Sequence, residues 1–271
     1  MGKYKLLAID IDGTLIKSDQ TISPRTRTAL IKAQEQGVRV VITTGRPTFG
    51  AAPFADELRL ADFNSYVISF NGSEIWNWAT KELIHSVLLD KDIKPYAYTC
   101  AKQNGFQILA YIGQNVVAED PNNEYVKFSS TRNKMPVRPV QNFLTDTDNA
   151  QPKFLIVGDP EPLHTLELKM SEHLQGKAEV YRSEPFFLEV VPHGIDKATG
   201  LSVLCAKLGI PQSSIIAFGD GFNDVSMIEY AGMGVAMGNA QQVVKNNADY
   251  ITLSNEADGI AEVIEKFITG R

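Results

Sequence analysis

The first third of the chain alternates apolar runs with amphipathic stretches. The apolar runs are rich in Val, Ile and Leu and predict buried strands at 4–11, 38–44 and 65–72. The stretches between them predict helices at 23–36 and 46–60. Ser23 and Pro24 form a helix start signal, and Gly37 a stop signal. Strands joined through helices predict right-handed crossovers and a parallel sheet.

The same alternation returns after residue 192. Helices are predicted at 197–208, 223–231, 240–248 and 257–268. Strands are predicted at 214–220, 234–237 and 249–252. Both ends of the chain are therefore expected to build one α/β domain, a Rossmann-like, doubly wound parallel sheet formed by 1–83 and 192–271.

The middle of the chain, 84–191, has a different pattern. Its apolar runs have mixed polarity and predict strands at 83–89, 106–112, 126–130, 153–158 and 186–191. Helices are predicted at 93–103 and 163–174, and polar, turn-rich stretches at 131–139 and 145–152. This pattern indicates an α+β domain with a largely antiparallel sheet, inserted into the α/β domain.

Composition narrows the classes of function. The chain has 271 residues and a net charge of −6, with no block of basic residues. Nucleic acid is therefore not expected as a partner, because its phosphates are bound through clustered Lys and Arg. No stretch is typical of a signal peptide or a membrane span, so we expect no membrane partner and a cytoplasmic location. Cys100 and Cys205 form no CxxC pair and are expected to be free thiols.

The first predicted strand ends in two carboxylates, Asp10 and Asp12, followed by Gly13. A hairpin turn is one interpretation, but the apolar run after Gly13 is too short for a return strand. A calcium loop would need Gly and Glu where Leu15 and Thr21 stand. Open α/β sheets bind their ligands at the carboxyl ends of parallel strands, and this favours a chemical role for the pair.

A second acidic group follows the strand at 214–220. It contains Asp220, Asn223 and Asp224. Helix capping explains one such residue but not two carboxylates, and Asp224 stands where a dinucleotide fingerprint needs Gly. Converging carboxylates repel one another unless a cation binds, and all-oxygen ligands beside a phosphate favour Mg²⁺. Magnesium is thus the expected cofactor.

Two further segments suit a phosphate group. Thr44 and Gly45 follow the second strand, and Lys197 begins a predicted helix. Thr44 could equally be only the cap of the next helix, and a lone Lys is commonly a solvated surface charge. Their positions at the edges of the α/β pattern keep both as candidate phosphate ligands.

Taken in order, the segments Asp10–Thr14, Thr44–Arg46, Lys197 and Gly219–Asp224 resemble the motifs of the haloacid dehalogenase superfamily of phosphotransferases. The TTGRP stretch, the FNG stretch at 70–72 and the long insert are similar to its Cof-type subfamily. This resemblance implies a Rossmann-like core with an inserted α+β cap of the C2 type.

The resemblance also implies a role for each matching residue. Asp10 would attack phosphorus and form an aspartyl-phosphate, and Asp12 would protonate the leaving oxygen and then activate water. The implied phosphate-binding residues are Thr44, Gly45, Lys197 and Asn223. The implied magnesium ligands are Asp10, Asp12 through its backbone carbonyl, Asp220 and Asp224.

The expected function is a Mg²⁺-dependent phosphatase acting on a small phosphorylated metabolite, with sugar phosphates as the first candidates. A phosphomutase, similar to phosphomannomutases, and a non-catalytic phosphometabolite-binding module are the alternatives. The sequence leaves the substrate, the cap residues that select it and the oligomeric state (monomer or homodimer) open.

Overall fold

The computed structural model describes residues 3–148 and 150–270, which fold into two compact units. The first unit, here called the core unit, comprises Met1–His85 and Asp196–Arg271. The second, here called the inserted unit, comprises Ser86–Ile195. The boundaries that the sequence suggested were 84 and 191.

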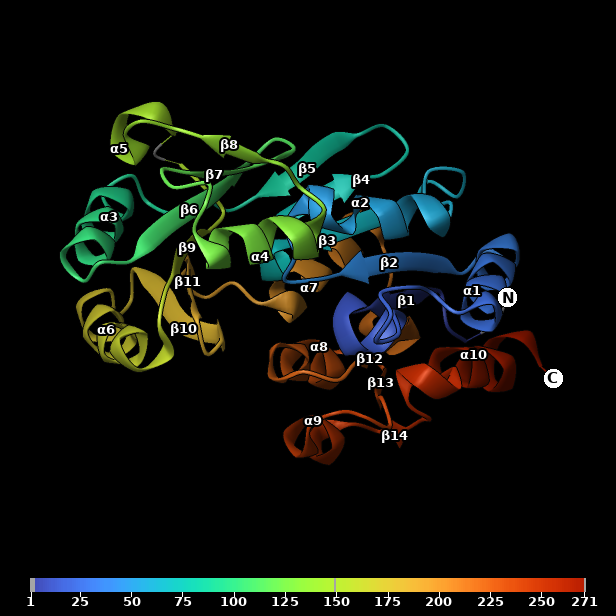
Figure 1. The fold of residues 1–271 in the computed structure, drawn as a ribbon. Helices are drawn as coiled ribbons and strands as arrows, with labels where there is room; N and C mark the ends of the chain where they lie inside the picture. Colours follow the sequence, from blue (N-terminus) through green and yellow to red (C-terminus); the bar gives the residue numbers. More distant parts are fainter. Residues whose placement is uncertain (1–2, 149, 271) are drawn as a thin grey trace. The chain divides into compact units, whose positions relative to one another are not determined.

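The core unit is built on an eight-stranded sheet (Figure 1). Its strands in spatial order are β14 (Tyr250–Ile251), β13 (Met233–Ala236), β12 (Ile215–Gly219), β1 (Leu6–Ile9), β2 (Arg39–Thr43), β3 (Tyr66–Ser69), β4 (Glu74–Asn77) and β5 (Glu82–Ser86). Neighbours from β14 to β3 run parallel, and β4 runs antiparallel to β3. The predicted parallel sheet is confirmed. It has two additions: β4, which was not predicted, and β5, which corresponds to the strand expected at 83–89 in the inserted domain.

Helices cover both faces of this sheet. The helices of the core unit are α1 (Pro24–Glu35), α2 (Thr48–Glu57), α7 (Lys197–Leu208), α8 (Val225–Tyr230), α9 (Gln242–Asn247) and α10 (Gly259–Ile264). All four residues of β1 are fully buried, so neither face of that strand meets solvent. Helix α1 packs against α10, and α7 packs against α8.

The predicted start and stop signals act at the ends of two helices. The Ser23 side chain accepts a hydrogen bond from the Thr26 backbone amide and caps α1. Asp196 caps α7 in the same way, and Gly209 ends α7 in the left-handed conformation at φ 64°. Local sequence therefore sets the position of Lys197, the first residue of α7.

The inserted unit holds a six-stranded sheet. Its strands in spatial order are β10 (Ala178–Glu184), β11 (Phe187–Pro192), β9 (Phe154–Val157), β6 (Gln107–Ile112), β7 (Asn115–Ala118) and β8 (Val137–Pro139). All neighbours are antiparallel except β7 and β8. Its helices are α3 (Ile93–Gln103), α4 (Glu124–Asn133), α5 (Phe143–Asp146) and α6 (Pro160–His173).

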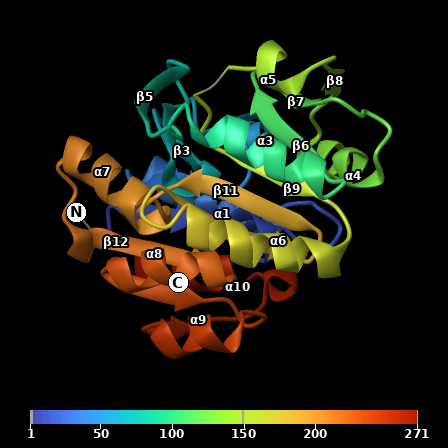
Figure 2. The ribbon, with the colours of Figure 1, turned by 90° about the vertical axis from the view of Figure 1, so that its left-hand side faces the viewer.

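Helices α3 and α6 line the apolar core of the inserted unit (Figure 2). The strands supply alternate residues to this core, as Phe154 and Ile156 of β9 do. The predicted fold class, a Rossmann-like core with an inserted α+β domain, is confirmed. Among the helices that the structure describes, none combines the length and the apolar character needed to cross a membrane.

One predicted strand is wrong. Residues 126–130 lie inside α4, because Asn123 accepts hydrogen bonds from the Tyr125 and Val126 amides and starts a helix there. Val126 and Ser129, three residues apart, form its buried side, so a helical spacing was mistaken for an extended one. Helix α2 is also shorter than predicted, since it begins only after Pro47. The strands β4, β7, β8 and β10 were not predicted.

Candidate active site

Two neighbouring strands deliver the acidic residues to one edge of the core sheet. Strands β1 and β12 pair in parallel, with Ile9 opposite Phe218. The Asp10 backbone amide still donates to the Phe218 carbonyl over 3.1 Å, and Asp220 follows directly after β12. The carboxyl ends of both strands therefore carry an aspartate at the same edge of the sheet, with Asp220 one residue beyond the position level with Asp10.

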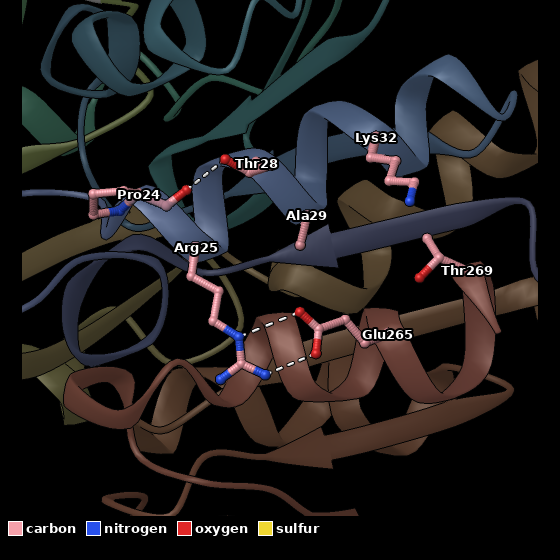
Figure 3. A pocket seen from close by; sticks show the side chains of 7 residues that line it. All are labelled: Pro24, Arg25, Thr28, Ala29, Lys32, Glu265 and Thr269. Atoms are coloured by element: carbon pink, nitrogen blue, oxygen red, sulfur yellow. Dashed lines mark hydrogen bonds and ion pairs between the residues drawn. The ribbon is translucent and has the colours of Figure 1, made fainter. Parts of the chain in front are cut away.

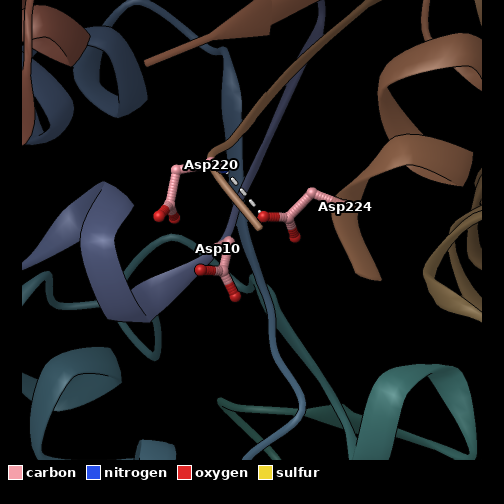
Figure 4. A group of neighbouring side chains, drawn as sticks. All are labelled: Asp10, Asp220 and Asp224. Atoms are coloured by element: carbon pink, nitrogen blue, oxygen red, sulfur yellow. Dashed lines mark hydrogen bonds between the residues drawn. The ribbon is translucent and has the colours of Figure 1, made fainter. Parts of the chain in front are cut away.

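Three carboxylates meet at this edge. Asp10, Asp220 and Asp224 each offer an oxygen, and these oxygens all lie within 4.8 Å of one another (Figure 4). Asp10 and Asp224 are buried, and Asp220 is partly exposed. The second oxygen of Asp224 accepts the backbone amides of Asp220 and Gly221, both over 2.9 Å. These bonds fold the loop after β12 back over the end of β1.

Lys197 lies inside this acidic group and is completely buried. Its Nζ donates to Asp10 Oδ1 over 2.6 Å and to Asp224 Oδ1 over 2.5 Å. Burial by itself lowers the pKa of Lys197, but the two carboxylates outweigh it and the pKa is raised. Lys197 therefore remains an ammonium at neutral pH, and the solvated surface charge considered for it is ruled out.

One ammonium does not balance three carboxylates. Burial, followed by the charge of Asp224, raises the pKa of Asp10 well above its usual value, although Lys197 opposes the shift. Burial also raises the pKa of Asp220 to about 6, against a hydrogen bond of 2.8 Å from Thr14. A site with excess negative charge and only oxygen ligands fits a hard divalent cation such as Mg²⁺.

Gly13 allows the two acidic segments to approach. It sits in the tight turn Ile11–Leu15 with φ at +73°, a left-handed conformation that favours glycine. A Cβ atom at this position would lie 2.3 Å from Asp220 Oδ2. The Asn239 side chain donates to the Gly13 carbonyl over 2.8 Å and supports the turn from the other side. Any larger residue at 13 would push Asp220 out of the acidic group.

The Asp12 carboxylate has its own partner, Arg46. Arg46 Nε donates to Asp12 Oδ2 over 2.8 Å, and Nη2 donates to Oδ1 over 2.7 Å. Only 5% of the Arg46 side chain is exposed, which makes the fork-shaped pair rigid. The negative charge of Asp12 is thus balanced, in contrast to that of the three clustered aspartates.

The predicted phosphate-binding loop follows β2. Thr44 Oγ1 accepts the Arg46 backbone amide over 3.1 Å, so Thr44 does shape this turn. An accepting hydroxyl keeps its own proton and can donate it to a ligand oxygen, so the turn and the binding role are compatible. Asn223 is exposed and donates to Asn71 Oδ1 over 3.0 Å, and Gly45 lies next to the same Asn71 side chain.

The structure adds three residues to which the sequence analysis gave no role: Thr14, Arg46 and Asn71. All three lie within the quoted motifs, so the sequence did mark their positions. Their roles were missed because each depends on a partner far along the chain, 206 residues away for Thr14 and 34 for Arg46.

A separate surface pocket lies between α1 and the C-terminal segment (Figure 3). Arg25 crosses it and donates to both Glu265 carboxylate oxygens, over 3.2 and 2.7 Å. None of the predicted site residues lines this pocket.

Comparison with known proteins shows that this chain is similar to members of a large protein family. The family model described as haloacid dehalogenase-like hydrolase matches residues 7–264. The Bacillus subtilis protein named 5-amino-6-(5-phospho-D-ribitylamino)uracil phosphatase YcsE is 36% identical over 265 residues, which cover 97% of this chain and 96% of YcsE.

Solved structures agree with this relationship. A haloacid dehalogenase-like hydrolase from Bacteroides thetaiotaomicron is 50% identical and superimposes with a TM-score of 0.95, covering 97% of this chain and 99% of that one. The subclass IIB sugar phosphatase BT4131 is 27% identical with a TM-score of 0.81, and the match covers 97% of this chain and 98% of that one. Each comparison spans both the core unit and the inserted unit.

Proposed function

The chain belongs to the haloacid dehalogenase-like hydrolases, in their Cof-type subfamily, and we propose that it is a magnesium-dependent phosphatase of small phosphorylated metabolites. One observation carries this proposal above the others. The buried Asp10 carboxylate, bonded to Lys197, stands among Asp220 and Asp224 at the edge where an open α/β sheet binds its ligand.

Asp10 is the proposed nucleophile. One of its oxygens attacks phosphorus and forms an aspartyl-phosphate while the bond from phosphorus to the leaving oxygen breaks. The Lys197 bond at Asp10 Oδ1 holds the carboxylate in one orientation for this attack. Lys197 and the Thr44 hydroxyl then stabilise the negative charge on the non-bridging phosphoryl oxygens. The Gly45 backbone and Asn223 complete the proposed phosphate site.

Asp12 is the proposed acid and base. Asp12 is ionised while it is paired with Arg46, so it takes up a proton from solvent as the substrate binds. It gives this proton to the leaving oxygen, and later takes one from the water that hydrolyses the aspartyl-phosphate. Arg46 holds both Asp12 oxygens in the structure, so one of these two bonds has to be exchanged for the leaving oxygen. Arg46 thereby orients Asp12 and limits its movement.

The proposed magnesium ligands are the carboxylates of Asp10, Asp220 and Asp224 together with the Asp12 backbone carbonyl. The three carboxylates offer hard oxygens close enough to share one ion. Bound Mg²⁺ would neutralise the excess charge of the aspartates and polarise a phosphoryl oxygen.

Sugar phosphates are the proposed substrates. The names of YcsE and BT4131 refer to a phosphorylated ribityl group and to a sugar phosphatase. Both are phosphate monoesters on a polyhydroxylated carbon chain, and we extend this chemistry to the present chain. The inserted unit is the proposed cap that reads the leaving group and excludes water.

A phosphate-release assay tests the function. The purified protein is screened against sugar phosphates, nucleotides, pyridoxal phosphate and flavin mononucleotide, with Mg²⁺ or with a chelator. We expect release only with Mg²⁺, and fastest from sugar phosphates. Isomerised hexose phosphate without free phosphate would identify a phosphomutase instead. Binding of these compounds with no reaction of any kind would leave a non-catalytic module.

A further inference from the structure

The turn that follows β3, Phe70–Gly72, adopts an unusual backbone conformation. Its three residues have φ values of +50°, +54° and +108° in succession. Left-handed conformations are uncommon for residues other than glycine, and they persist where the surrounding structure holds them in place. The turn leaves β3 at the carboxyl end of the strand, the same edge that carries Asp10.

The backbone of this turn is bonded to the proposed phosphate loop. The Asn71 amide donates to the Thr44 carbonyl over 2.9 Å, and the Phe70 amide donates to the Arg46 carbonyl over 3.0 Å. These two bonds lie on either side of Gly45 in the sequence. The turn therefore sets the position of both ends of this short loop.

The same turn packs closely on the start of α7. A Cβ atom at Gly72 would lie 2.1 Å from the Asp196 carbonyl oxygen, and one at Gly200 would lie 2.7 Å from the Gly72 Cα. Such close backbone contact is possible only because both positions are glycine. The turn consequently also supports the first turn of α7, where Lys197 begins the helix.

The Asn71 side chain reaches the third segment of the site. Its Oδ1 accepts the Asn223 side-chain amide over 3.0 Å, from the loop that carries Asp220 and Asp224. A Cβ atom at Gly45 would come within 3.0 Å of the same oxygen. The Asn71 carboxamide thus lies between the phosphate loop and the acidic loop.

We propose that Asn71 is a positioning residue that holds Gly45 and Asn223 at the spacing needed to bind a phosphoryl group. Glycine also adopts the left-handed backbone conformation found at position 71, so this conformation alone does not require asparagine. The hydrogen bond to Asn223 is what asparagine adds. This inference rests on the proposed function, because it takes a phosphoryl group as the ligand.

The test replaces the side chain without disturbing the backbone. Asn71→Gly keeps the left-handed conformation accessible and removes the side chain, which is the Cβ methylene with its carboxamide. Binding of inorganic phosphate with Mg²⁺ is measured by calorimetry, and KM and kcat are measured with the best sugar phosphate from the screen. We expect the phosphate dissociation constant and KM to rise about tenfold, as for one lost hydrogen bond, with kcat changed less than about threefold.

Asn64→Gly is the matched control. Asn64 also has a left-handed backbone, at φ 48°, and its side chain also bonds to an asparagine, Asn77, over 3.1 Å. It precedes β3 instead of following it, so it lies at the opposite edge of the sheet from Asn71. This variant is expected to bind phosphate as the unmodified protein does.

A double-mutant cycle with Asn223→Ala separates positioning from a general loss of structure. In the Asn223→Ala background, Asn71→Gly should weaken phosphate binding less than it does in the unmodified protein, because the bond to Asn223 is already broken and only the contact with Gly45 is lost. Should Asn71→Gly fail to fold, Asn71→Ala replaces it, because alanine also lacks the carboxamide and the same rise in the phosphate dissociation constant is expected.

Unchanged phosphate binding in Asn71→Gly, or additive effects in the cycle, would overturn the inference. Calorimetry needs no turnover, so an unmodified protein that binds phosphate but hydrolyses nothing would refute the phosphatase and still test Asn71. An unmodified protein that neither binds phosphate nor releases it from any substrate would refute both.

Discussion

Each of the two units buries a lysine that is paired with carboxylate, but the positive and negative charges balance in only one unit. In the inserted unit, Lys153 Nζ lies 2.7 Å from Glu189 Oε2, and the other Glu189 oxygen accepts the Ser183 hydroxyl over 2.7 Å. In the core unit, Lys197 faces Asp10 and Asp224, with Asp220 beside them. Both lysines are buried, so the number of carboxylates is the main difference.

The contrast between crowded and well-partnered carboxylates also appears in pKa values, with Glu119, which lies outside the Lys153 pair, as the example from the inserted unit. In the core unit, burial and the neighbouring charges raise the pKa of Asp10 and of Asp220. In the inserted unit, burial opposes the shift, but hydrogen bonds from Lys102, the Phe143 amide and Tyr98 lower the pKa of Glu119. A carboxylate with enough partners stabilises the fold as it stands, whereas crowded carboxylates need a further cation. The unbalanced group is therefore the one that we expect to bind a ligand.

The largest expected effect comes from removing one charge from the group of three clustered carboxylates, Asp10, Asp220 and Asp224. Asp10→Asn should lower kcat by more than about a thousandfold, because an amide is not a competent nucleophile. Its remaining oxygen can still accept from Lys197, so the melting temperature without Mg²⁺ should be unchanged or higher. Phosphate release and thermal unfolding measure the two outcomes. Near-normal turnover would remove Asp10 as the nucleophile.

Breaking the balanced pair of Lys153 and Glu189 should lower the stability of the fold. Lys153→Met leaves Glu189 buried without its cation, and we expect the free energy of unfolding to fall by about 3 kcal/mol. Adding Glu189→Leu should restore most of this loss, because an apolar pair of similar size replaces the two charges. Chemical denaturation followed by circular dichroism measures both. A double variant as unstable as Lys153→Met would show that charge balance is not the cause.

Arg46 gives the core unit a balanced pair next to the unbalanced group. Arg46→Lys keeps the charge but not the two parallel bonds to Asp12, and kcat should fall about tenfold to a hundredfold. Arg25→Lys is the control, since Arg25 forms the same fork with Glu265 on the surface (Figure 3). Steady-state kinetics should show no change for Arg25→Lys. Equal rates for the two variants would show that the Asp12 fork has no catalytic role.

The smallest expected effect is a pH dependence of the stabilisation of the fold by Mg²⁺. The pKa of Asp220 is about 6 in the folded protein against a usual 3.8, so the folded state binds more protons than the unfolded state between these values. Stability without metal therefore falls as the pH rises through this window. Mg²⁺ binds the ionised carboxylates, and at pH 5 it must displace a proton.

We therefore expect Mg²⁺ to raise the melting temperature by at least about 3 °C more at pH 7.5 than at pH 5. Thermal unfolding with Mg²⁺ or with a chelator measures this difference. Asp220→Asn should abolish most of it. An equal Mg²⁺ effect at both pH values would indicate that the ion binds elsewhere.

The local sequence was sufficient to predict much of the fold. The predicted bounds of α3 and α7 match the structure, and those of α1 differ only at its ends. At α1 and α7 this is because caps and glycine stops act within a few residues, whereas α3 has no side-chain cap and ends just before Gly105, at φ +75°. The strands β1, β2, β3 and β12 were predicted because strands buried on both faces are continuously apolar. The strand wrongly placed at 126–130 lies where polar and apolar residues mix and periodicity is ambiguous.

The sequence by itself determined which chemical groups the protein has and the strand ends that carry them: Asp10, Asp12, Thr44 and Asp220 stand directly after apolar runs. Only the tertiary structure decided their partners. It pairs Asp12 with Arg46, places Lys197 between Asp10 and Asp224, and joins Asn71 to Asn223 across 152 residues. The reason is physical: short-range patterns set backbone conformation, whereas charge balance in a buried site depends on which distant segments the sheet brings together.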